Sequence, residues 1–233
     1  MIEQDAIRAI ITGSTGMVGE GVLRACLERK DVAAVLVINR KPCGISHPKL
    51  SEVIHADFFD ISAIASALDG YNACFFCLGV TSLRKTEAIY DKLTYTLTLN
   101  FAKILCQINP FMTFCYVSGK GTDSSEKGSI MWARVKGRTE NALMKLPFQK
   151  VICFRPGFIR PVKGYKNTHK FYKYVNWLFP LGRKWFPATF CTLEELSEVM
   201  IDAPYFPEKT ALIEGEDIHR LAHITPQLQI NSK

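Results

Sequence analysis

The stretch Ile11-Thr12-Gly13-Ser14-Thr15-Gly16-Met17-Val18-Gly19 follows an apolar run and precedes a helix-like pattern, and its glycines have the spacing G-x-x-G-x-x-G. We expect Gly13 to turn the chain off a strand, Gly16 to let a phosphate approach the backbone, and Gly19 to let the helix pack against the sheet. The start of such a helix presents unpaired N–H groups to an anion. Other positions expected at this phosphate site are Ser14, Thr15, Met17 and Val18. The alternative is a strand-to-helix turn without a ligand.

Apolar runs alternate with helix-like patterns along the chain. The runs predict strands at 6–12, 33–38, 52–56, 73–78, 111–117 and 151–154. The intervening patterns predict helices at 17–29, 61–68, 87–108 and 130–146. Strand–helix alternation of this kind is typical of an α/β fold with a doubly wound parallel sheet, the Rossmann arrangement.

The character of the chain changes after about residue 160. We expect residues 1–160 to form an NAD(P)-binding domain and residues 161–233 to form a small helical and aromatic extension of the same domain that covers the substrate. A Thr192-x-x-Glu195 capping box opens a predicted helix over 193–202, and a strand is expected over 210–214, with nothing regular after it. The aromatic, basic stretch 165–190 suits a substrate cover, an aromatic satellite core with solvated lysines, or contact with a membrane surface.

Composition restricts the possible partners and compartments. The 233 residues carry a formal net charge of +7, which suits an anionic ligand, but the basic residues are scattered, so no nucleic-acid binding is expected. No apolar run approaches the ~20 residues of a membrane span, and no signal peptide is expected. Most of the eight cysteines lie in apolar runs, including Cys74 and Cys77, which we interpret as core positions on opposite strand faces. These features predict reduced thiols and a cytoplasmic location.

The end of the second predicted strand carries Asn39-Arg40-Lys41 and no acid. A carboxylate at this point would bind the ribose 2′-hydroxyl of NAD, whereas Arg40 and Lys41 attract a 2′-phosphate. The triplet therefore favours NADP(H) over NAD(H). The alternative is a solvated basic turn.

Two further strand ends belong to the expected binding edge, because ligands of such sheets lie beyond the carboxyl ends of the strands. Asp57 and Phe58 end the third strand, where they either hold the adenine edge or cap the next segment. Leu78 and Gly79 end the fourth strand, where the glycine lets backbone approach the middle of the cofactor.

Taken together, these motifs resemble the short-chain dehydrogenase/reductase superfamily, and the glycine spacing is similar to its extended and atypical branches, which include sugar-nucleotide epimerases and NmrA-like regulators. The resemblance covers roughly residues 6–160. The residues that carry it are Thr12–Gly19, Asp57-Phe58, Leu78-Gly79, Ser118, Lys136 and Arg155-Pro156-Gly157. It implies a Rossmann fold and an NAD(P) cofactor, but not one reaction, because the superfamily covers many chemistries.

The resemblance also implies a catalytic Ser, Tyr and Lys, with the last two spaced Y-x-x-x-K. Ser118 and Lys136 occupy two of these positions, but Trp132 stands where the Tyr is expected. An indole N–H gives up no proton near neutral pH, so Trp132 cannot be the general acid or base. Lys136 remains a candidate contact to the nicotinamide ribose. The resemblance places Pro156, Gly157 and Phe158 beside the nicotinamide, whereas Arg155 either joins them or forms a structural ion pair.

Three hypotheses about function remain, and the first two address the missing tyrosine. The protein is an NADP(H)-dependent oxidoreductase or epimerase-like enzyme whose acid–base group has moved, with Tyr90, Tyr116 and Tyr165 as candidates. Alternatively, it binds NADP(H) without turnover and signals to a partner protein. A third possibility is a peripheral membrane protein that uses residues 165–190. The substrate and the oligomeric state are not indicated.

Two histidines, His219 and His223, have the i, i+4 spacing that places both side chains on one helix face. No third ligand lies near them in the sequence, and they follow a Gly-Glu-Asp segment that suggests a turn. We therefore expect surface histidines and no metal site.

Overall fold

A seven-stranded sheet with the order β3-β2-β1-β4-β5-β6-β9 forms the centre of the protein, and all its neighbouring strands are parallel. The computed structural model describes residues 6–167, 179–185, 189–207 and 210–230. The strands are β1 (Ile7–Thr12), β2 (Val32–Asn39), β3 (Leu50–Ile54), β4 (Ala73–Phe76), β5 (Thr113–Val117), β6 (Lys150–Arg155) and β9 (Leu212–Glu214). The predicted doubly wound α/β fold is confirmed.

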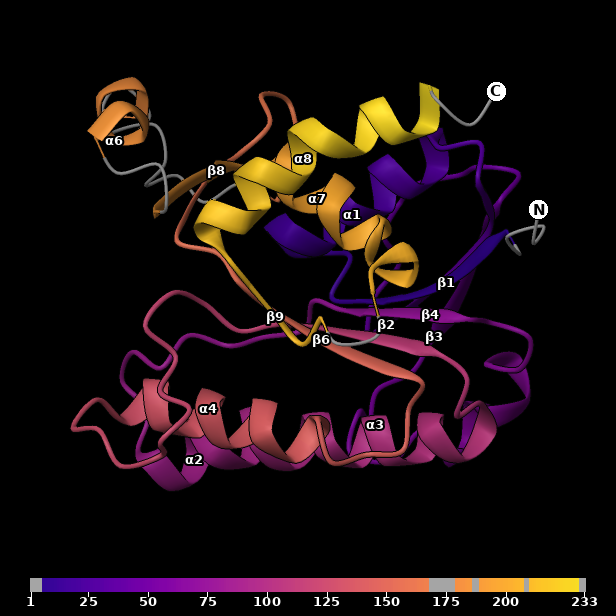
Figure 1. Ribbon diagram of the computed structural model, residues 1–233. Helices are drawn as coiled ribbons and strands as arrows, with labels where there is room; N and C mark the ends of the chain where they lie inside the picture. Colours follow the sequence, from indigo (N-terminus) through magenta and orange to yellow (C-terminus); the bar gives the residue numbers. More distant parts are fainter. Residues whose placement is uncertain (1–5, 168–178, 186–188, 208–209, 231–233) are drawn as a thin grey trace.

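Helices cover both faces of the sheet (Figure 1). One face carries α1 (Met17–Glu28), α7 (Leu193–Ile201) and α8 (Gly215–Ile230). The other carries α2 (Glu87–Asp91), α3 (Leu97–Ile108) and α4 (Met131–Leu143). A π-helical turn, η2 (Lys92–Thr96), joins α2 to α3, so the predicted helix over 87–108 is continuous.

Strand side chains alternate between two apolar cores, one on each face of the sheet. Ile11 contributes to the core under α1 and α7, whereas its neighbour Ile10 contributes to the core under α3. Cys74 packs in the second core and Cys77 against the first, so the predicted placement of these two cysteines on opposite faces is confirmed. Burial on both faces explains why the central strands are continuously apolar.

Several boundaries differ from the expected ones. The third strand begins and ends two residues earlier than predicted, and the helix expected over 61–68 is a 3-10 helix, η1 (Ser62–Ala67). A short 3-10 helix, η5 (Ala203–Tyr205), follows α7. Boundaries are weakly specified by local sequence because the ends of elements are fixed by packing and capping contacts.

The chain after β9 is helical, so the expectation of an irregular tail is wrong. The Gly-Glu-Asp segment is the first turn of α8, where Glu216 and Asp217 complement the positive end of the helix dipole. Ile218 is fully buried against the rest of the core. The acidic residues Glu216 and Asp217 therefore mark the start of a helix that the burial of Ile218 stabilises, and they do not mark a turn.

Residues 158–192 contain a second, two-stranded parallel sheet of β7 (Phe158–Arg160) and β8 (Phe190–Thr192), with α6 (Phe179–Trp185) between them in the chain. Phe158, Phe179 and Phe190 form an aromatic cluster with ring centroids 5.4 to 6.3 Å apart. Much of the aromatic, basic stretch 165–190 lies outside the described residues, so its expected role as a cover or membrane contact stays a prediction. Within the described part of the chain, every helix is too short or too polar to cross a membrane.

Candidate functional site

The glycine turn between β1 and α1 brings three pieces of backbone into contact. Gly13 has a φ of +70°, and a Cβ atom there would lie 2.8 Å from the carbonyl oxygen of Cys77. A Cβ atom at Gly19 would lie 2.2 Å from the carbonyl oxygen of Gly13. No larger residue fits at either position without moving backbone. The turn therefore has the shape expected of a phosphate cradle.

A cavity of about 530 Å³, which we call the β2-side cavity, opens beside this turn. Its lining residues come from the glycine turn and from the carboxyl ends of β2, β3 and β4. They are Gly13, Thr15, Ile38, Asn39, Arg40, Lys41, Pro42, Phe58 and Leu78. Arg40 and Lys41 are exposed, and no carboxylate is among these described residues. The cavity is therefore basic.

Three polar residues expected at this end have structural partners instead of facing the cavity freely. The hydroxyl of buried Ser14 donates to Asn39 Oδ1 at 2.9 Å, and Asn39 Nδ2 donates to Glu52 Oε1 at 2.9 Å. Asp57 Oδ1 accepts the backbone N–H of Phe59 at 2.8 Å in a local turn and caps no helix, because the N-cap residue of η1 is Ile61. Asp57 does not line the cavity, whereas Phe58 does.

A second cavity of about 560 Å³, which we call the β5-side cavity, adjoins the first, and Leu78 lines both. It lies at the carboxyl ends of β4, β5 and β6. Its lining residues are Val18, Cys77, Leu78, Gly79, Val80, Val117, Ser118, Gly119, Lys120, Lys136, Pro156, Gly157, Phe158, Ile159 and Thr189. The structure brings together six further predicted site residues here besides Leu78 and Val18, namely Gly79, Ser118, Lys136, Pro156, Gly157 and Phe158. Ser14, Gly16, Met17, Gly19 and Asp57 line neither cavity.

Lys136 projects from α4 into this cavity, and its ammonium group donates a hydrogen bond to the carbonyl oxygen of Ser118. Burial disfavours the charged form and lowers the pKa of Lys136 to about 8, although the nearby Glu140 carboxylate opposes this shift. Lys136 is therefore a group that can exchange a proton near neutral pH.

Ser118 lines the same cavity, but its hydroxyl group has a partner inside the protein. Ser118 Oγ lies 2.5 Å from Glu140 Oε1 and 3.1 Å from the carbonyl oxygen of Phe154. Glu140 is fully buried and forms an ion pair with Arg155, with 2.5 Å between Oε2 and Nη2. Arg155 is thus a structural ion-pair residue, and the Ser118 proton points to a carboxylate.

Trp132 and the three candidate tyrosines pack against other parts of the protein. Trp132 is half-buried on α4, and a Cβ atom at Gly121 would lie 3.5 Å from its ring. Tyr90 and Tyr116 are buried in or beside the core under α3. Tyr165 packs beneath Arg24, with 4.7 Å between the guanidinium carbon and the ring centroid. None of these four residues is among the cavity-lining residues that the structure describes.

Lys120 and Thr189 are lining residues that sequence reasoning missed. Lys120 Nζ donates to Thr189 Oγ1 at 2.5 Å. A Cβ atom at Gly157 would lie 2.2 Å from the carbonyl oxygen of Thr189, so this glycine is required by the approach of the 189 backbone. Thr189 is 32 residues beyond Gly157 in the chain, and no local pattern signals their contact.

Glu20 on α1 is a second residue without a sequence signal. Its buried carboxylate accepts the backbone N–H groups of Lys166 and Asn167 at 3.2 and 2.9 Å. Burial opposes the charge, but these hydrogen bonds and those of Arg24 and the Asn167 side chain outweigh it and lower the pKa of Glu20. The carboxylate thereby ties the chain after β7 to the helix that begins at the glycine turn.

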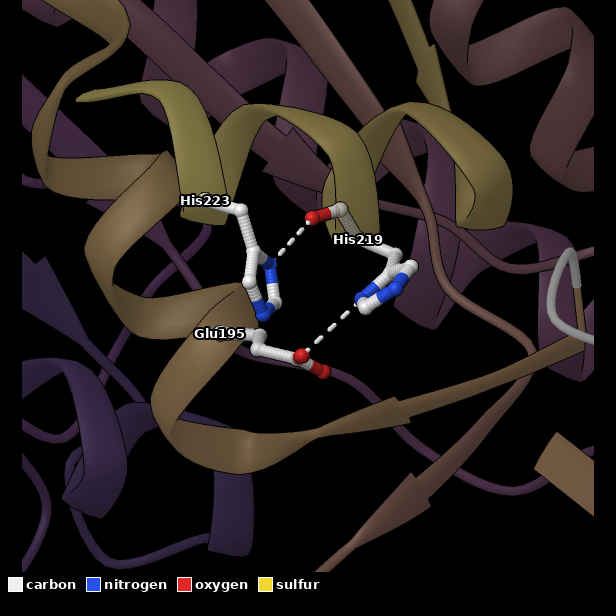
Figure 2. Close-up of side chains that lie close together, drawn as sticks. All are labelled: Glu195, His219 and His223. Carbon is white, nitrogen blue, oxygen red and sulfur yellow. Dashed lines mark hydrogen bonds and ion pairs between the residues drawn. The ribbon is translucent and has the colours of Figure 1, made fainter. Parts of the chain in front are cut away.

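His219 and His223 have a neighbour that the sequence did not indicate. The carboxylate of Glu195, on α7, lies 3.1 Å from His219 Nδ1 (Figure 2). His219 is half-buried and His223 exposed. A third potential ligand thus lies near in space although none lies near in the sequence, because the packing of α8 on α7 brings together residues 24 positions apart.

Two named proteins, FMP52 and HTATIP2, have sequences similar to this chain. The mitochondrial protein FMP52 of Meyerozyma guilliermondii is 26% identical over 154 residues, which cover 66% of this chain and 65% of FMP52. Protein HTATIP2 of Rattus norvegicus is 26% identical over 151 residues, which cover 64% of this chain and 61% of HTATIP2. The chain thus matches less than two thirds of the length of these relatives. No protein-family profile matches the chain.

Solved structures with the same fold cover more of the chain. A short-chain dehydrogenase from Burkholderia cenocepacia in complex with NADP superposes with a TM-score of 0.65 and 16% identity, over 94% of this chain and 92% of the dehydrogenase. The enzyme WbmG of Bordetella bronchiseptica in complex with NAD gives a TM-score of 0.67 and 13% identity, over 96% of this chain and 79% of WbmG. The predicted resemblance to short-chain dehydrogenases and epimerases is confirmed at the level of the fold.

The expected cytoplasmic location is contradicted by the relatives, because FMP52 of Meyerozyma guilliermondii is a mitochondrial protein. The prediction rested on cysteines in apolar runs and on a sequence in which we expected neither a signal peptide nor a membrane span. All eight cysteines are free and buried or half-buried. Free thiols in a core reflect packing, and they do not distinguish one compartment from another.

Proposed function

We propose that the chain is an NADP(H)-binding protein of the atypical short-chain dehydrogenase/reductase kind that carries out oxidoreductase or epimerase-like chemistry on a small molecule. The observation that carries the proposal is the pair of adjoining cavities along the carboxyl ends of β1, β2, β4, β5 and β6, joined at Leu78. Ligands of doubly wound sheets bind at this edge, where the strand order reverses. Here the reversal lies between β1 and β4.

The residues present fit a dinucleotide. The glycine turn provides backbone without side chains where a Cβ atom would clash with Cys77 or Gly13. Gly79 has open space where its side chain would be. Residues proposed to hold the cofactor are Gly13, Ser14, Thr15, Gly16, Met17, Val18, Gly19, Phe58, Leu78, Gly79, Lys136, Pro156, Gly157 and Phe158, with Asn39 as a support for Ser14. Asp57 is proposed to act indirectly: its carboxylate accepts the backbone N–H of Phe59 and so holds the turn that carries Phe58.

NADP(H) is preferred over NAD(H) in this proposal because of charge. Arg40 and Lys41 line the β2-side cavity, and a 2′-phosphate there gains two cationic partners. Glu52 is the acid of the adjacent strand, but its Oε1 accepts from Asn39 and from the backbone N–H of Cys43. No described lining residue would repel the phosphate.

Lys136 takes the role of the proton carrier in the β5-side cavity. A bound nicotinamide supplies or accepts a hydride, and a substrate oxygen then needs a proton or must lose one. The lowered pKa of Lys136, about 8, matches that need, whereas burial raises the pKa of Cys77 to about 12. Ser118 contributes its backbone carbonyl, which orients the Lys136 ammonium group.

A non-catalytic NADP(H) sensor is the second candidate, and a specific observation favours it. The Ser118 hydroxyl is directed to Glu140, and no tyrosine is among the described lining residues. A site that has lost both hydroxyl groups retains cofactor binding while losing acid–base catalysis, typically by a factor of about 10² to 10⁴.

Two measurements on the full chain test these proposals. Calorimetry with NADPH and NADH should show tighter binding of NADPH, and equal affinities would refute the preference. A panel of aldehydes and ketones should then show NADPH oxidation that is lost in Lys136→Met. NADPH binding without oxidation of any panel member would favour the sensor, and absence of binding to either dinucleotide would refute both candidates.

A further inference from the structure

A cluster of two imidazoles and a carboxylate lies where α8 packs on α7, and none of its three residues lines either cavity. Glu195 belongs to α7, and His219 and His223 belong to successive turns of α8 (Figure 2). One ligand atom of each residue lies within 4.8 Å of the others. Two histidines and one glutamate are a common ligand set for zinc, because imidazole nitrogen and carboxylate oxygen both bind this borderline ion.

The geometry of the cluster is close to that of a metal site. His219 Nδ1 and Glu195 Oε1 are 3.1 Å apart, and the two imidazole rings lie with centroids 4.5 Å apart. Ligand atoms of a tetrahedral zinc site lie about 3.4 Å from one another, which follows from bonds of about 2.0–2.2 Å. The ligand atom of His223 lies within 4.8 Å of the other two, and because His223 is exposed, a rotation of its side chain would bring this atom to the required spacing.

The backbone holds His223 in the tautomer that a metal needs. His223 Nδ1 lies 2.8 Å from the carbonyl oxygen of His219, which can only accept, so Nδ1 carries the proton and Nε2 carries the lone pair. Metal-binding histidines are commonly oriented by such a bond from the second ring nitrogen to a carbonyl. Glu195 is also fixed, because its Oε2 accepts the backbone N–H of Thr192 at 2.8 Å in the capping box.

A positive charge already sits beside these ligands. Arg183 Nη2 lies 2.5 Å from Glu195 Oε1 and 2.8 Å from His219 Nδ1. The guanidinium group thus neutralises the Glu195 carboxylate and occupies His219 Nδ1, the nitrogen that would bind a metal ion. A metal ion that binds there must displace Arg183, which is half-buried on α6.

We propose that Glu195, His219 and His223 form a zinc site in which Arg183 occupies the place of the ion when zinc is absent. The three side chains leave one coordination position for water. Binding of Zn²⁺ cross-links α7 to α8 and releases Arg183, and with it α6, from Glu195. The site is independent of the proposed dinucleotide function, because no residue of the cluster lines either cavity.

Titration of the full chain with ZnCl₂ against a chromophoric zinc indicator tests the proposal. The wild-type protein should bind one equivalent of Zn²⁺, and His223→Gln should weaken binding at least tenfold because a ligand is lost. Arg183→Gln should bind Zn²⁺ about tenfold more tightly, since removing the competing cation removes its repulsion of the metal. The matched control is His55→Gln, which changes a histidine just after the edge strand β3 and outside the cluster. This variant should bind Zn²⁺ as the wild type does.

Cobalt spectroscopy distinguishes this site from one made by cysteines. The Co²⁺ form should show d–d bands without a thiolate charge-transfer band, and the bands should disappear in His223→Gln. Absence of zinc binding, binding that His223→Gln leaves unchanged, or a thiolate band would each overturn the proposal. Weaker or equal binding by Arg183→Gln would overturn the role of Arg183. Thermal melts of the metal-free variants identify any change in folding.

Discussion

The two adjoining cavities differ in how their polar side chains are used. At the β2-side cavity, Arg40 and Lys41 are exposed at the end of one strand and remain available to a ligand. At the β5-side cavity, Ser118 and Lys136 are held by Glu140 and by backbone within the protein. The comparison teaches that neighbouring strand ends of one sheet can leave charged side chains open to a ligand at one cavity and use polar side chains in internal hydrogen bonds at the other.

The largest expected effect lies beneath the β5-side cavity. Glu140→Ala leaves the buried Arg155 guanidinium without its main partner and removes one of the two acceptors near the Ser118 hydroxyl. Breaking a buried ion pair from one side costs about 3–5 kcal/mol in the free energy of unfolding, which urea denaturation measures.

The matched control for this variant is Glu87→Ala, which removes an ion pair with Arg134 whose carboxylate side chain is 53% exposed. Such exposed pairs contribute about 0–1 kcal/mol. Equal losses in the two variants would show that the network of Ser118, Glu140 and Arg155 does not stabilise the β5-side cavity.

The next effect concerns the turn that the two cavities share. Gly19→Ala places a Cβ atom 2.2 Å from the Gly13 carbonyl oxygen, so α1 must shift away from the turn. We expect a loss of about 1–3 kcal/mol in the free energy of unfolding and a large loss of NADPH affinity. Gly79→Ala meets no atom within 4 Å and should leave stability unchanged. Calorimetry and denaturation of both variants check this contrast, and a Gly19→Ala protein with unchanged NADPH affinity would exclude the cradle.

The third prediction tests the β2-side cavity alone. Replacing Arg40 and Lys41 by Ala should weaken NADPH binding by a factor of about 10 to 100, because two charge-assisted contacts to the 2′-phosphate are lost. NADH binding should hardly change. The control replaces exposed Lys127 and Lys145 by Ala, which removes the same charge elsewhere. If NADPH and NADH weaken equally, the assignment of the 2′-phosphate is wrong.

The last prediction concerns the dependence of stability on pH. The pKa of Lys136 is about 8 in the folded protein against 10.5 for an unperturbed lysine. Between these values the unfolded chain binds more protons than the folded one, so the contribution of Lys136 to stability rises as the pH rises from about 8 to about 10. The free energy of unfolding of Lys136→Met, measured relative to the wild type, should therefore fall across this range.

Lys103→Met is the control for this titration, because Lys103 is exposed on α3. Its free energy of unfolding relative to the wild type should stay constant over the same pH range. If the difference in free energy of unfolding between Lys136→Met and the wild type is also independent of pH, burial does not lower the pKa of Lys136. The two cavities would then not differ in the electrostatics of their lysines.

Much of the fold could be predicted because the decisive signals are local. The apolar runs of the central strands are continuous, since both faces of the sheet are covered, and the glycine turn is a contiguous stretch. Helix α8 was missed because its first turn resembles a loop when the burial of Ile218 is unknown. The sheet of β7 and β8 was missed because its two strands are separated by 29 residues.

The sequence by itself determined the doubly wound sheet, the shape of the turn at Gly13 and the absence of a tyrosine four residues before Lys136. Each of these depends on neighbours within a few positions. Only the tertiary structure decided that the Ser118 hydroxyl faces Glu140, that burial lowers the pKa of Lys136, and that Glu195 meets His219. The hydrogen-bond partners named here lie 18 to 24 positions apart in the chain, and desolvation depends on how distant segments pack, so local sequence patterns do not reveal either.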